Sequence, residues 1–209
     1  MTLSEIEGAC AGVDGVVFDF GGVMTVSPKD DDWPVYAYCA KFGVDRAAVD
    51  RGWQRYRNLW DGGFISFAEF YRRTFADAGA TIGAAQLDVL WELDAEVWFR
   101  TLRTDTLALM HRLKTSGKKI GILSNMSPES YERLFVPGCA EYRVLLDAEV
   151  ISGLEFLFKP EEPIYRLMER RMGLPPARLI FLDDTEVNVL AARAFGWRAE
   201  IYPPFSPKD

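Results

Sequence analysis

Asp19 stands where a short apolar run of the chain ends. Residues 16–18 predict a buried strand that stops at Asp19, and Gly21 and Gly22 follow at once. Open α/β sheets bind ligands at the carboxyl ends of their strands, where glycines let the backbone turn and approach a ligand. Turn chemistry alone also explains an Asp beside glycines. A carboxylate in this place could nevertheless act as a nucleophile or a metal ligand, which makes Asp19 the first candidate catalytic residue.

Three later segments carry further reactive side chains at strand ends or in loops. The apolar run KIGIL ends in the hydroxyl of Ser124, the segment FKP carries Lys159, and LIFL is followed by Asp183 and Asp184. If these runs are strands of one sheet, the segments converge on one of its edges. The edge would then combine a nucleophilic carboxylate, a hydroxyl, a cation and an acid pair of the type that binds metals.

These segments, in this order, resemble the four motifs of the haloacid dehalogenase superfamily of Rossmann-like hydrolases. KPEEPIY, which begins at Lys159, echoes the motif KPDPxIY, and DDTEVNVLAARAFGW, which begins at Asp183, echoes DDxxxNxxxAxxxGx. Ser152 lies seven residues before Lys159, as is usual for such sequences. The resemblance spans nearly the whole chain. It looks closest to the branch of subfamily I, with a helical C1-type cap, that includes the phosphatase domain of soluble epoxide hydrolases.

The resemblance implies an α/β fold: a Rossmann-like, mostly parallel sheet with a small helical cap inserted after the first strand. Residues 1–26 and 100–209 would form the core, and residues 27–99 the cap. Hydrophobic periodicity agrees, because strands alternate with helices outside the cap and helical periods fill it. The expected cap helices are 33–42, 47–60, 66–78 and 84–98. The expected core elements are a helix 4–11 with Ser4 as N-cap and Glu7 completing a capping box, helices 105–116, 127–135, 162–172 and 188–195, a turn at Pro137-Gly138, and strands 148–152 and 199–202.

The same resemblance implies roles for the motif residues. Asp19 would attack phosphorus, Ser124 would donate to a phosphoryl oxygen, and Lys159 would keep Asp19 ionised while offsetting charge in the transition state. Mg²⁺ would be the cofactor, since it prefers oxygen ligands. Its site would consist of Asp19, the carbonyl of Gly21, Asp184, Asp183 and Asn188, and Gly22 and Asn125 would help to bind the phosphoryl group.

Aromatic residues are concentrated in the expected cap, which holds five of the six tryptophans. A small helical insert needs large side chains for its own core, and this reading is favoured for most of them. Alternatively, some of them line an apolar pocket over Asp19, which would suit a small phosphorylated metabolite with an apolar or aromatic part. The candidates for such a pocket are Trp33, Tyr56 and Trp60, followed by Tyr36, Trp53 and Phe64.

Gly21 departs from the pattern of the superfamily's phosphatases. They usually place there a second Asp that protonates the departing oxygen and later activates water, whereas glycine has no side chain to do so. General acid–base help contributes about 10² to 10⁴ in rate. Three explanations are open: a leaving group that departs readily as an anion, a substitute acid from the cap such as Asp61, Glu69 or Tyr56, or the loss of hydrolysis.

Two other functions compete with phosphate ester hydrolysis. Dehalogenation by attack of Asp19 on carbon needs neither acid nor metal, so Gly21 would be harmless, but the pair Asp183 and Asp184 would then have no purpose. A non-catalytic protein could keep the fold and bind a phosphorylated ligand or a protein partner. The intact set Asp19, Ser124, Lys159 and Asp184 argues against that reading, because a binding module does not need an attacking carboxylate.

Composition limits the partners. A net charge of −7 over 209 residues gives no basic surface for nucleic acid, and no apolar run is long enough to span a membrane. Three widely spaced cysteines predict reduced thiols in a cytoplasmic protein. The single histidine, His111, lies within an expected helix, which excludes a catalytic triad based on it. The expected partner is a small phosphorylated molecule.

Overall fold

A five-stranded parallel sheet forms the centre of the computed structural model, which describes residues 2–26 and 33–205. The strand order is β3-β2-β1-β4-β5, so β1 lies in the middle. All four strand pairs are parallel, and Phe18 at the end of β1 lies level with Ile122 of β2 and Leu182 of β4. The predicted α/β class is confirmed. The strands are β1 (Gly15–Phe18), β2 (Lys119–Ser124), β3 (Ala148–Ile151), β4 (Leu179–Asp183) and β5 (Arg198–Ile201).

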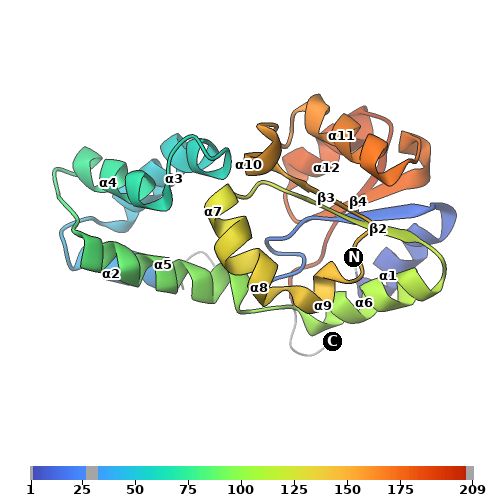
Figure 1. Ribbon diagram of the computed structural model, residues 1–209, viewed down its shortest axis with the longest axis horizontal. Helices are drawn as coiled ribbons and strands as arrows, with labels where there is room; N and C mark the ends of the chain where they lie inside the picture. Colours follow the sequence, from blue (N-terminus) through green and yellow to red (C-terminus); the bar gives the residue numbers. More distant parts are fainter. Residues whose placement is uncertain (1, 27–32, 206–209) are drawn as a thin grey trace.

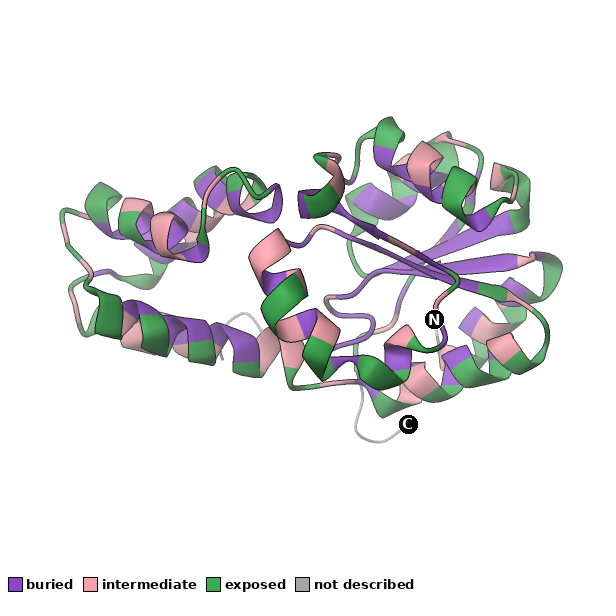
Figure 2. Cartoon of the chain, viewed as in Figure 1, coloured by how far each residue is buried: buried purple, intermediate pink, exposed green. Residues whose placement is uncertain are grey.

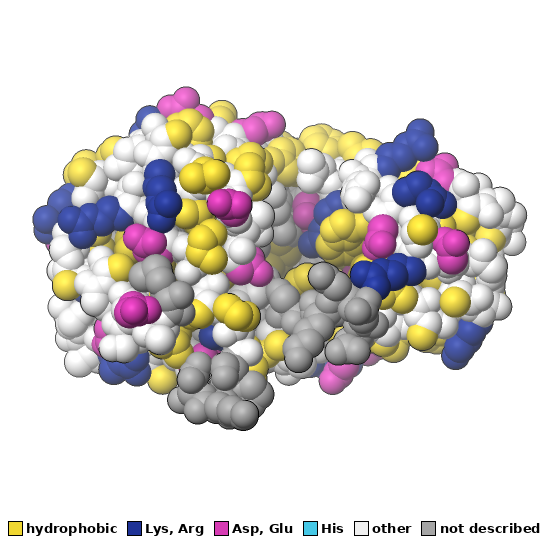
Figure 3. All heavy atoms as spheres, turned by 180° about the vertical axis from the view of Figure 1, so that it is seen from behind, with side chains coloured by type: hydrophobic (Ala, Val, Ile, Leu, Met, Phe, Trp, Pro, Cys, Tyr) yellow, Lys and Arg dark blue, Asp and Glu magenta, His cyan; other side chains and the backbone are white. Residues whose placement is uncertain are grey.

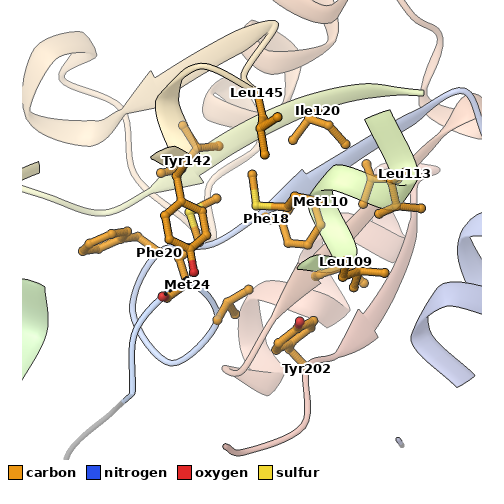
Figure 4. Packing of buried hydrophobic residues seen from close by; sticks show 14 of the residues in the cluster. Phe18, Phe20, Met24, Leu109, Met110, Leu113, Ile120, Tyr142, Leu145 and Tyr202 are labelled. Atoms are coloured by element: carbon orange, nitrogen blue, oxygen red, sulfur yellow. Dashed lines mark hydrogen bonds between the residues drawn. The ribbon is translucent and has the colours of Figure 1, made fainter. Parts of the chain in front are cut away.

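Helices cover both faces of this sheet (Figure 1). On one face, Val17 of β1 packs in a buried cluster with residues of α11 and α12. On the other face, Phe18 packs with Met110 of α6 and with Tyr142, which Figure 4 shows from close by. A strand buried on both faces must be apolar throughout, which explains the continuous run of β1. The core helices are α1 (Leu3–Ala9), α6 (Thr104–Thr115), α7 (Pro128–Ser130), α8 (Val136–Gly138), α9 (Ala140–Arg143), α10 (Ser152–Glu155), α11 (Glu162–Met172) and α12 (Glu186–Ala194).

Four helices form a separate lobe beside the sheet (Figure 1). They are α2 (Pro34–Ala40), α3 (Arg46–Asp61), α4 (Phe67–Asp77) and α5 (Ala84–Phe99). Each lies where periodicity predicted a helix, and their buried residues face one another in a cluster rich in aromatic side chains (Figure 2). Residues 27–32, with which the expected cap begins, lie outside the described residues. None of the described helices is long and apolar enough to cross a lipid bilayer.

Two predicted details of the core were wrong. The first helix is capped by Thr2, whose side chain accepts a hydrogen bond from the Glu5 backbone and forms a capping box with it, so Ser4 is not the N-cap. Thr2 with Glu5 and Ser4 with Glu7 both match the sequence pattern of a capping box. The helix begins at the earlier of the two. The expected turn at Pro137-Gly138 is helical, because a π-helical stretch Tyr131–Phe135 leads directly into α8 with Pro137 in its first turn. His111 is exposed on α6, as expected.

The helical lobe joins the core at several places, one of them the hydrogen bond of 3.0 Å from the Phe67 amide of α4 to the Glu129 carboxylate of α7. The chain leaves and returns through adjacent segments, where the Val26 amide donates to the Thr101 carbonyl over 2.9 Å and Thr25 pairs with Leu102. At the far end of α3, the Ser152 hydroxyl donates to the carbonyl of Asp61 over 2.8 Å. These attachments hold the lobe over the carboxyl edge of the sheet.

Arg103 fixes the loop that follows β1. Its guanidinium is buried, with 1% of the residue exposed, and forms a bidentate pair with Asp105. Its Nη1 also donates to the carbonyls of Gly22, over 3.1 Å, and Pro203, over 2.8 Å. The same residue accepts a hydrogen bond from the Tyr142 hydroxyl at its carbonyl. The loop that carries the two glycines is therefore held by a charged group beneath it.

Replacement of this group should destabilise the whole core. Arg103→Ala would leave a half-buried carboxylate and two carbonyls without their donor, and we expect the free energy of unfolding to fall by about 3–5 kcal/mol in urea titrations. Arg112→Ala is the matched control, because Arg112 pairs with Glu7 at the surface and its loss should cost less than about 1 kcal/mol. Equal losses for the two variants would contradict this assignment.

Candidate active site

Asp19 occupies the first position after β1, at the carboxyl edge of the sheet. Its backbone amide donates to the Leu182 carbonyl over 2.9 Å, which continues the pairing of β1 with β4 by one residue. The residue is 8% exposed, and Oδ1 lies 2.8 Å from Nζ of Lys159. The central strand therefore delivers a buried, paired carboxylate to the edge where parallel sheets bind ligands.

Lys159 links two carboxylates. Its Nζ lies 2.7 Å from Oδ2 of Asp183 in addition to its contact with Asp19, and the residue is 5% exposed. Asn125 fixes the backbone that carries it: the side-chain amide donates to the Lys159 carbonyl over 3.0 Å, and Oδ1 accepts from the Lys159 amide over 2.9 Å. An unpaired buried ammonium would be very costly. Lys159 therefore needs both of its carboxylate partners for the folded structure to be stable.

The acid pair at the end of β4 divides into two environments. Asp183 is fully buried, and its oxygens accept hydrogen bonds from Lys159, the Asn188 amide at 3.0 Å and the Thr185 backbone at 2.7 Å. Asp184 is exposed beside it. Carboxylate oxygens of Asp19, Asp183 and Asp184 all lie within 4.8 Å of one another. Asp183 is thus oriented by its neighbours, while Asp184 and Asp19 face a common point.

The charges in this cluster affect one another strongly. Burial raises the pKa of Asp19 to about 7; Lys159 opposes that rise, and the carboxylates of Asp183 and Asp184 add to it. Burial disfavours the charged form of Lys159, but Asp183 and Asp19 raise its pKa above the ordinary value. Three carboxylates face one ammonium, so the cluster has an excess of negative charge. A further cation would favour the ionised form of Asp19.

The residues fit a magnesium ion by charge and by ligand type. A hard dication prefers oxygen ligands and tolerates a site that is completed by water and substrate. Asp19 and Asp184 supply carboxylates, Gly21 lines the same space with its backbone, and Asp183 and Asn188 form the hydrogen-bonded support around them.

A cavity of about 420 Å³ opens above these residues, between the two lobes. Seen from behind, the surface of the molecule is hollowed there (Figure 3). Its core side includes Asp19, Gly21, Ser124, Lys159 and Asp184. The motif residues that are far apart in the sequence therefore share one cavity.

The opposite wall of the cavity comes from α3 and α5. Trp53, Arg57, Trp60 and Asp61 lie on one face of α3, and Asp94 and Trp98 lie one turn apart on α5; together these residues are called the roof. Arg57 lies over the rings of Trp53, at 4.1 Å, and Trp60, at 4.8 Å, and its Nε is 2.6 Å from Oδ2 of Asp61. Of the roof, sequence reasoning did not single out Arg57, Asp94 and Trp98.

Only some of the other residues predicted to contact the substrate line the cavity. Trp60 and Asn125 line the cavity, although the Asn125 side chain is engaged with Lys159. Trp33, Tyr56 and Gly22 are not among the described residues that line it. Trp33 and Tyr56 pack in the aromatic core of the lobe, where the Tyr56 hydroxyl donates to Asp77, and the Gly22 carbonyl accepts from Arg103.

The three predicted substitutes for the missing acid also differ in whether they line the cavity. Asp61 lines the cavity and is 4% exposed. Glu69 bonds to Arg73 along α4 and, like Tyr56, is not among the described residues of the cavity wall. Trp98 covers the place where an acid would project from Gly21, since a Cβ added at Gly21 would lie 3.4 Å from Cζ3 of that indole.

Comparison with solved structures gives the same fold. A haloacid dehalogenase family enzyme from Bacteroides thetaiotaomicron, crystallised with magnesium and inorganic phosphate, superimposes with a TM-score of 0.71 at 18% identity over 93% of this chain and 96% of that one. L-2-haloacid dehalogenase from Xanthobacter autotrophicus gives 0.66 at 19% identity, over 94% and 80%. At these identities the likeness concerns the fold.

Sequence comparison identifies the family. An (S)-2-haloacid dehalogenase from Pseudomonas putida is 32% identical over 194 residues, which cover 88% of this chain and 82% of that protein. Protein CbbY from Cereibacter sphaeroides is 26% identical over 92% of this chain and 85% of its own length. The profile of the haloacid dehalogenase-like hydrolases matches residues 13–196. The chain therefore belongs to the haloacid dehalogenase-like hydrolase family.

Proposed function

We propose that this hydrolase is a Mg²⁺-dependent phosphatase that works through an aspartyl-phosphate on Asp19. The observation that carries the proposal is the cluster of three carboxylates, Asp19, Asp183 and Asp184, around one lysine at the floor of the cavity. Such a cluster repels anions unless a dication is added, and a dication beside a nucleophilic carboxylate is what phosphoryl transfer requires. The substrate is a small phosphorylated molecule with an apolar or aromatic part.

The residues divide the chemistry as follows. Oδ2 of Asp19 attacks phosphorus, because Oδ1 is held by Lys159. The Ser124 hydroxyl donates to a phosphoryl oxygen, and the ammonium of Lys159 offsets charge that develops in the transition state. Asp183, fixed by Asn188 and Thr185, keeps Lys159 in place. When bound by Asp19, Asp184 and the Gly21 carbonyl, Mg²⁺ would screen the repulsion between the attacking carboxylate and the phosphoryl group.

The finer classification is part of the same proposal. We assign the chain to the branch with a helical cap, residues 27–99, that also includes the phosphatase domain of soluble epoxide hydrolases. The roof of the cavity belongs to this cap, which would thereby select the substrate. Cys10, Cys39 and Cys139 are all free and buried, as in a protein of the reducing cytoplasm.

Dehalogenation is the second candidate, favoured by the 32% identity with a haloacid dehalogenase. Charge argues against it. A 2-haloacid carries a carboxylate, and without a metal ion it would meet Asp19 and Asp184 with one lysine on the floor, backed by the buried Asp183, and two acids with one arginine in the roof. A cavity with this excess of negative charge repels the 2-haloacid anion.

Two activity assays separate these candidates. With Mg²⁺, the purified chain should release nitrophenolate from 4-nitrophenyl phosphate, whose leaving group needs little protonation. Asp19→Asn keeps the size of the side chain but removes the nucleophile, and turnover should fall on the order of 1000-fold or more.

Release of chloride from (S)-2-chloropropionate is measured in parallel. Chloride release without nitrophenolate release would contradict the phosphatase proposal and identify the chain as a dehalogenase. Binding of phosphate without turnover of either substrate would favour the non-catalytic alternative.

Binding of the metal ion can be measured through the stability of the protein. At ten times its dissociation constant, Mg²⁺ should stabilise the protein by about 1.4 kcal/mol, which corresponds to a rise in Tm of a few degrees in calorimetry. Asp184→Ala should abolish this rise because the ion loses a carboxylate ligand. Asp50→Ala, which removes a half-buried acid of α3 that pairs with Arg46 and does not line the cavity, is the matched control and should keep it. A rise in Tm that persists in Asp184→Ala would exclude the proposed site.

A further inference from the structure

Asp94 has no role in the chemistry described so far, although it is a carboxylic acid buried in the wall of the catalytic cavity. It is 5% exposed, and its Oδ1 has no hydrogen-bond partner among the described residues. No described arginine or lysine lies within ion-pair distance of it. The side chains of Trp33 and Trp98 lower the pKa of this carboxyl group, but they do not offset its burial, and a buried acid with an unpaired oxygen calls for an explanation.

The direction of phosphoryl transfer explains why an acid in the roof of the cavity matters. The attacking and leaving oxygens lie in line on opposite sides of phosphorus. Asp19 attacks from the floor, so the leaving oxygen must point away from the floor, toward the roof. A proton for that oxygen must therefore come from the roof or from the edge of the floor, and at that edge Gly21 has no side chain to supply one.

Few groups on the cavity wall can carry a proton. Among the described lining residues, the acids are Asp19, Asp184, Asp61 and Asp94, and the bases are Lys159 and Arg57. Asp19 is the nucleophile, Asp184 faces the metal site, and Lys159 is held between two carboxylates. Arginine does not give up its proton in proteins. Asp61 and Asp94 remain.

The surroundings of these two acids differ. Burial raises the pKa of Asp61, and the guanidinium of Arg57 opposes this rise through a direct ion pair in which Nε lies 2.6 Å from Oδ2. Asp94 lies one helical turn before Trp98, the side chain that stands over Gly21. The face of α5 that carries Asp94 thus covers the position from which the family's usual second Asp would act.

We propose that Asp94 is the proton donor and acceptor that replaces the acid missing at Gly21. As the ester P–O bond breaks and its electron pair stays on the leaving oxygen, the Asp94 carboxyl group transfers its proton to that oxygen. The Asp94 carboxylate then takes a proton from water, whose oxygen attacks phosphorus and breaks the bond to Asp19. The ester and water become alcohol and phosphate, and both acids return to their starting forms. This inference rests on the proposed phosphatase function.

The electrostatic environment of Asp94 agrees with this role. Burial raises its pKa to about 7, and the positive charge of Arg57 limits the rise. The other ionisable groups that face it are Asp61 on α3, Cys39 on α2 and Tyr71 on α4. An acid that is partly protonated near neutral pH can both give and take a proton there.

The test compares two aryl phosphates in the full chain with Mg²⁺. Phenyl phosphate has a poor leaving group that needs a proton, and 4-nitrophenyl phosphate has a good one that does not. Asp94→Asn should lower kcat/KM for phenyl phosphate at least about 100-fold. It should leave the first release of nitrophenolate within about tenfold of the natural chain, followed by slow turnover as the aspartyl-phosphate accumulates.

Asp61→Asn is the matched control and should affect both substrates by the same factor. The natural chain supplies a measurement that needs no variant: for phenyl phosphate, kcat/KM should decline above pH 7, where Asp94 loses its proton. This decline should be absent for 4-nitrophenyl phosphate.

An active enzyme with equal losses for the two substrates in Asp94→Asn, or without that selective decline, would overturn the role of Asp94 alone. Absence of phosphate release from either substrate by the natural chain would overturn the phosphatase proposal together with it.

Discussion

The buried ammonium of Lys159 is the interaction on which the candidate site depends. It lies 2.8 Å from Asp19 and 2.7 Å from Asp183, so it holds together the ends of β1 and β4. Asn125, directly after β2, clamps the backbone of the lysine. Without the ammonium, two carboxylates would face each other out of water, at a cost of several kcal/mol. The strand order β2-β1-β4 is what allows three strand ends to meet at one cation.

That same balance of charge limits what the cavity can bind. The floor has three acids and one lysine, and the roof has two acids and one arginine. A dication on the floor would leave room for one phosphoryl group, but no positive charge remains for a second anion. The indoles of Trp53, Trp60 and Trp98 offer flat apolar surface instead. On the proposed phosphatase function, the preferred substrate is therefore a monophosphate whose remaining part is uncharged and carries a ring.

The sequence predicted the floor of the site better than its roof. Asp19, Ser124 and Asp183 follow apolar runs, and a polar residue after a buried strand of a parallel sheet has its position fixed by topology. The roof depends on how α3 and α5 rotate about their axes and pack, which no local pattern determines. Because this rotation could not be predicted, Trp33 and Tyr56 were wrongly expected to line the cavity. They lie in the core of the lobe. Asp94 is one of four acids in the predicted helix 84–98, and its spacing of four from Trp98, on a helix with Leu90 and Trp91, is the signal that could have drawn attention to it.

An acid placed in the roof can serve a reaction on the floor only if the two lobes keep a fixed spacing. Both ends of the roof are tied to the core. The end of α3 is fixed by the hydrogen bond from Ser152 to Asp61 and by Phe64, whose ring lies 5.8 Å from that of Phe156 in the core. The end of α5 runs directly into Thr101, where the chain pairs with its outgoing segment. On the proposed role of Asp94, these attachments would compensate for the glycine at position 21, since a donor on a separate lobe needs attachments that a donor on the loop itself would not.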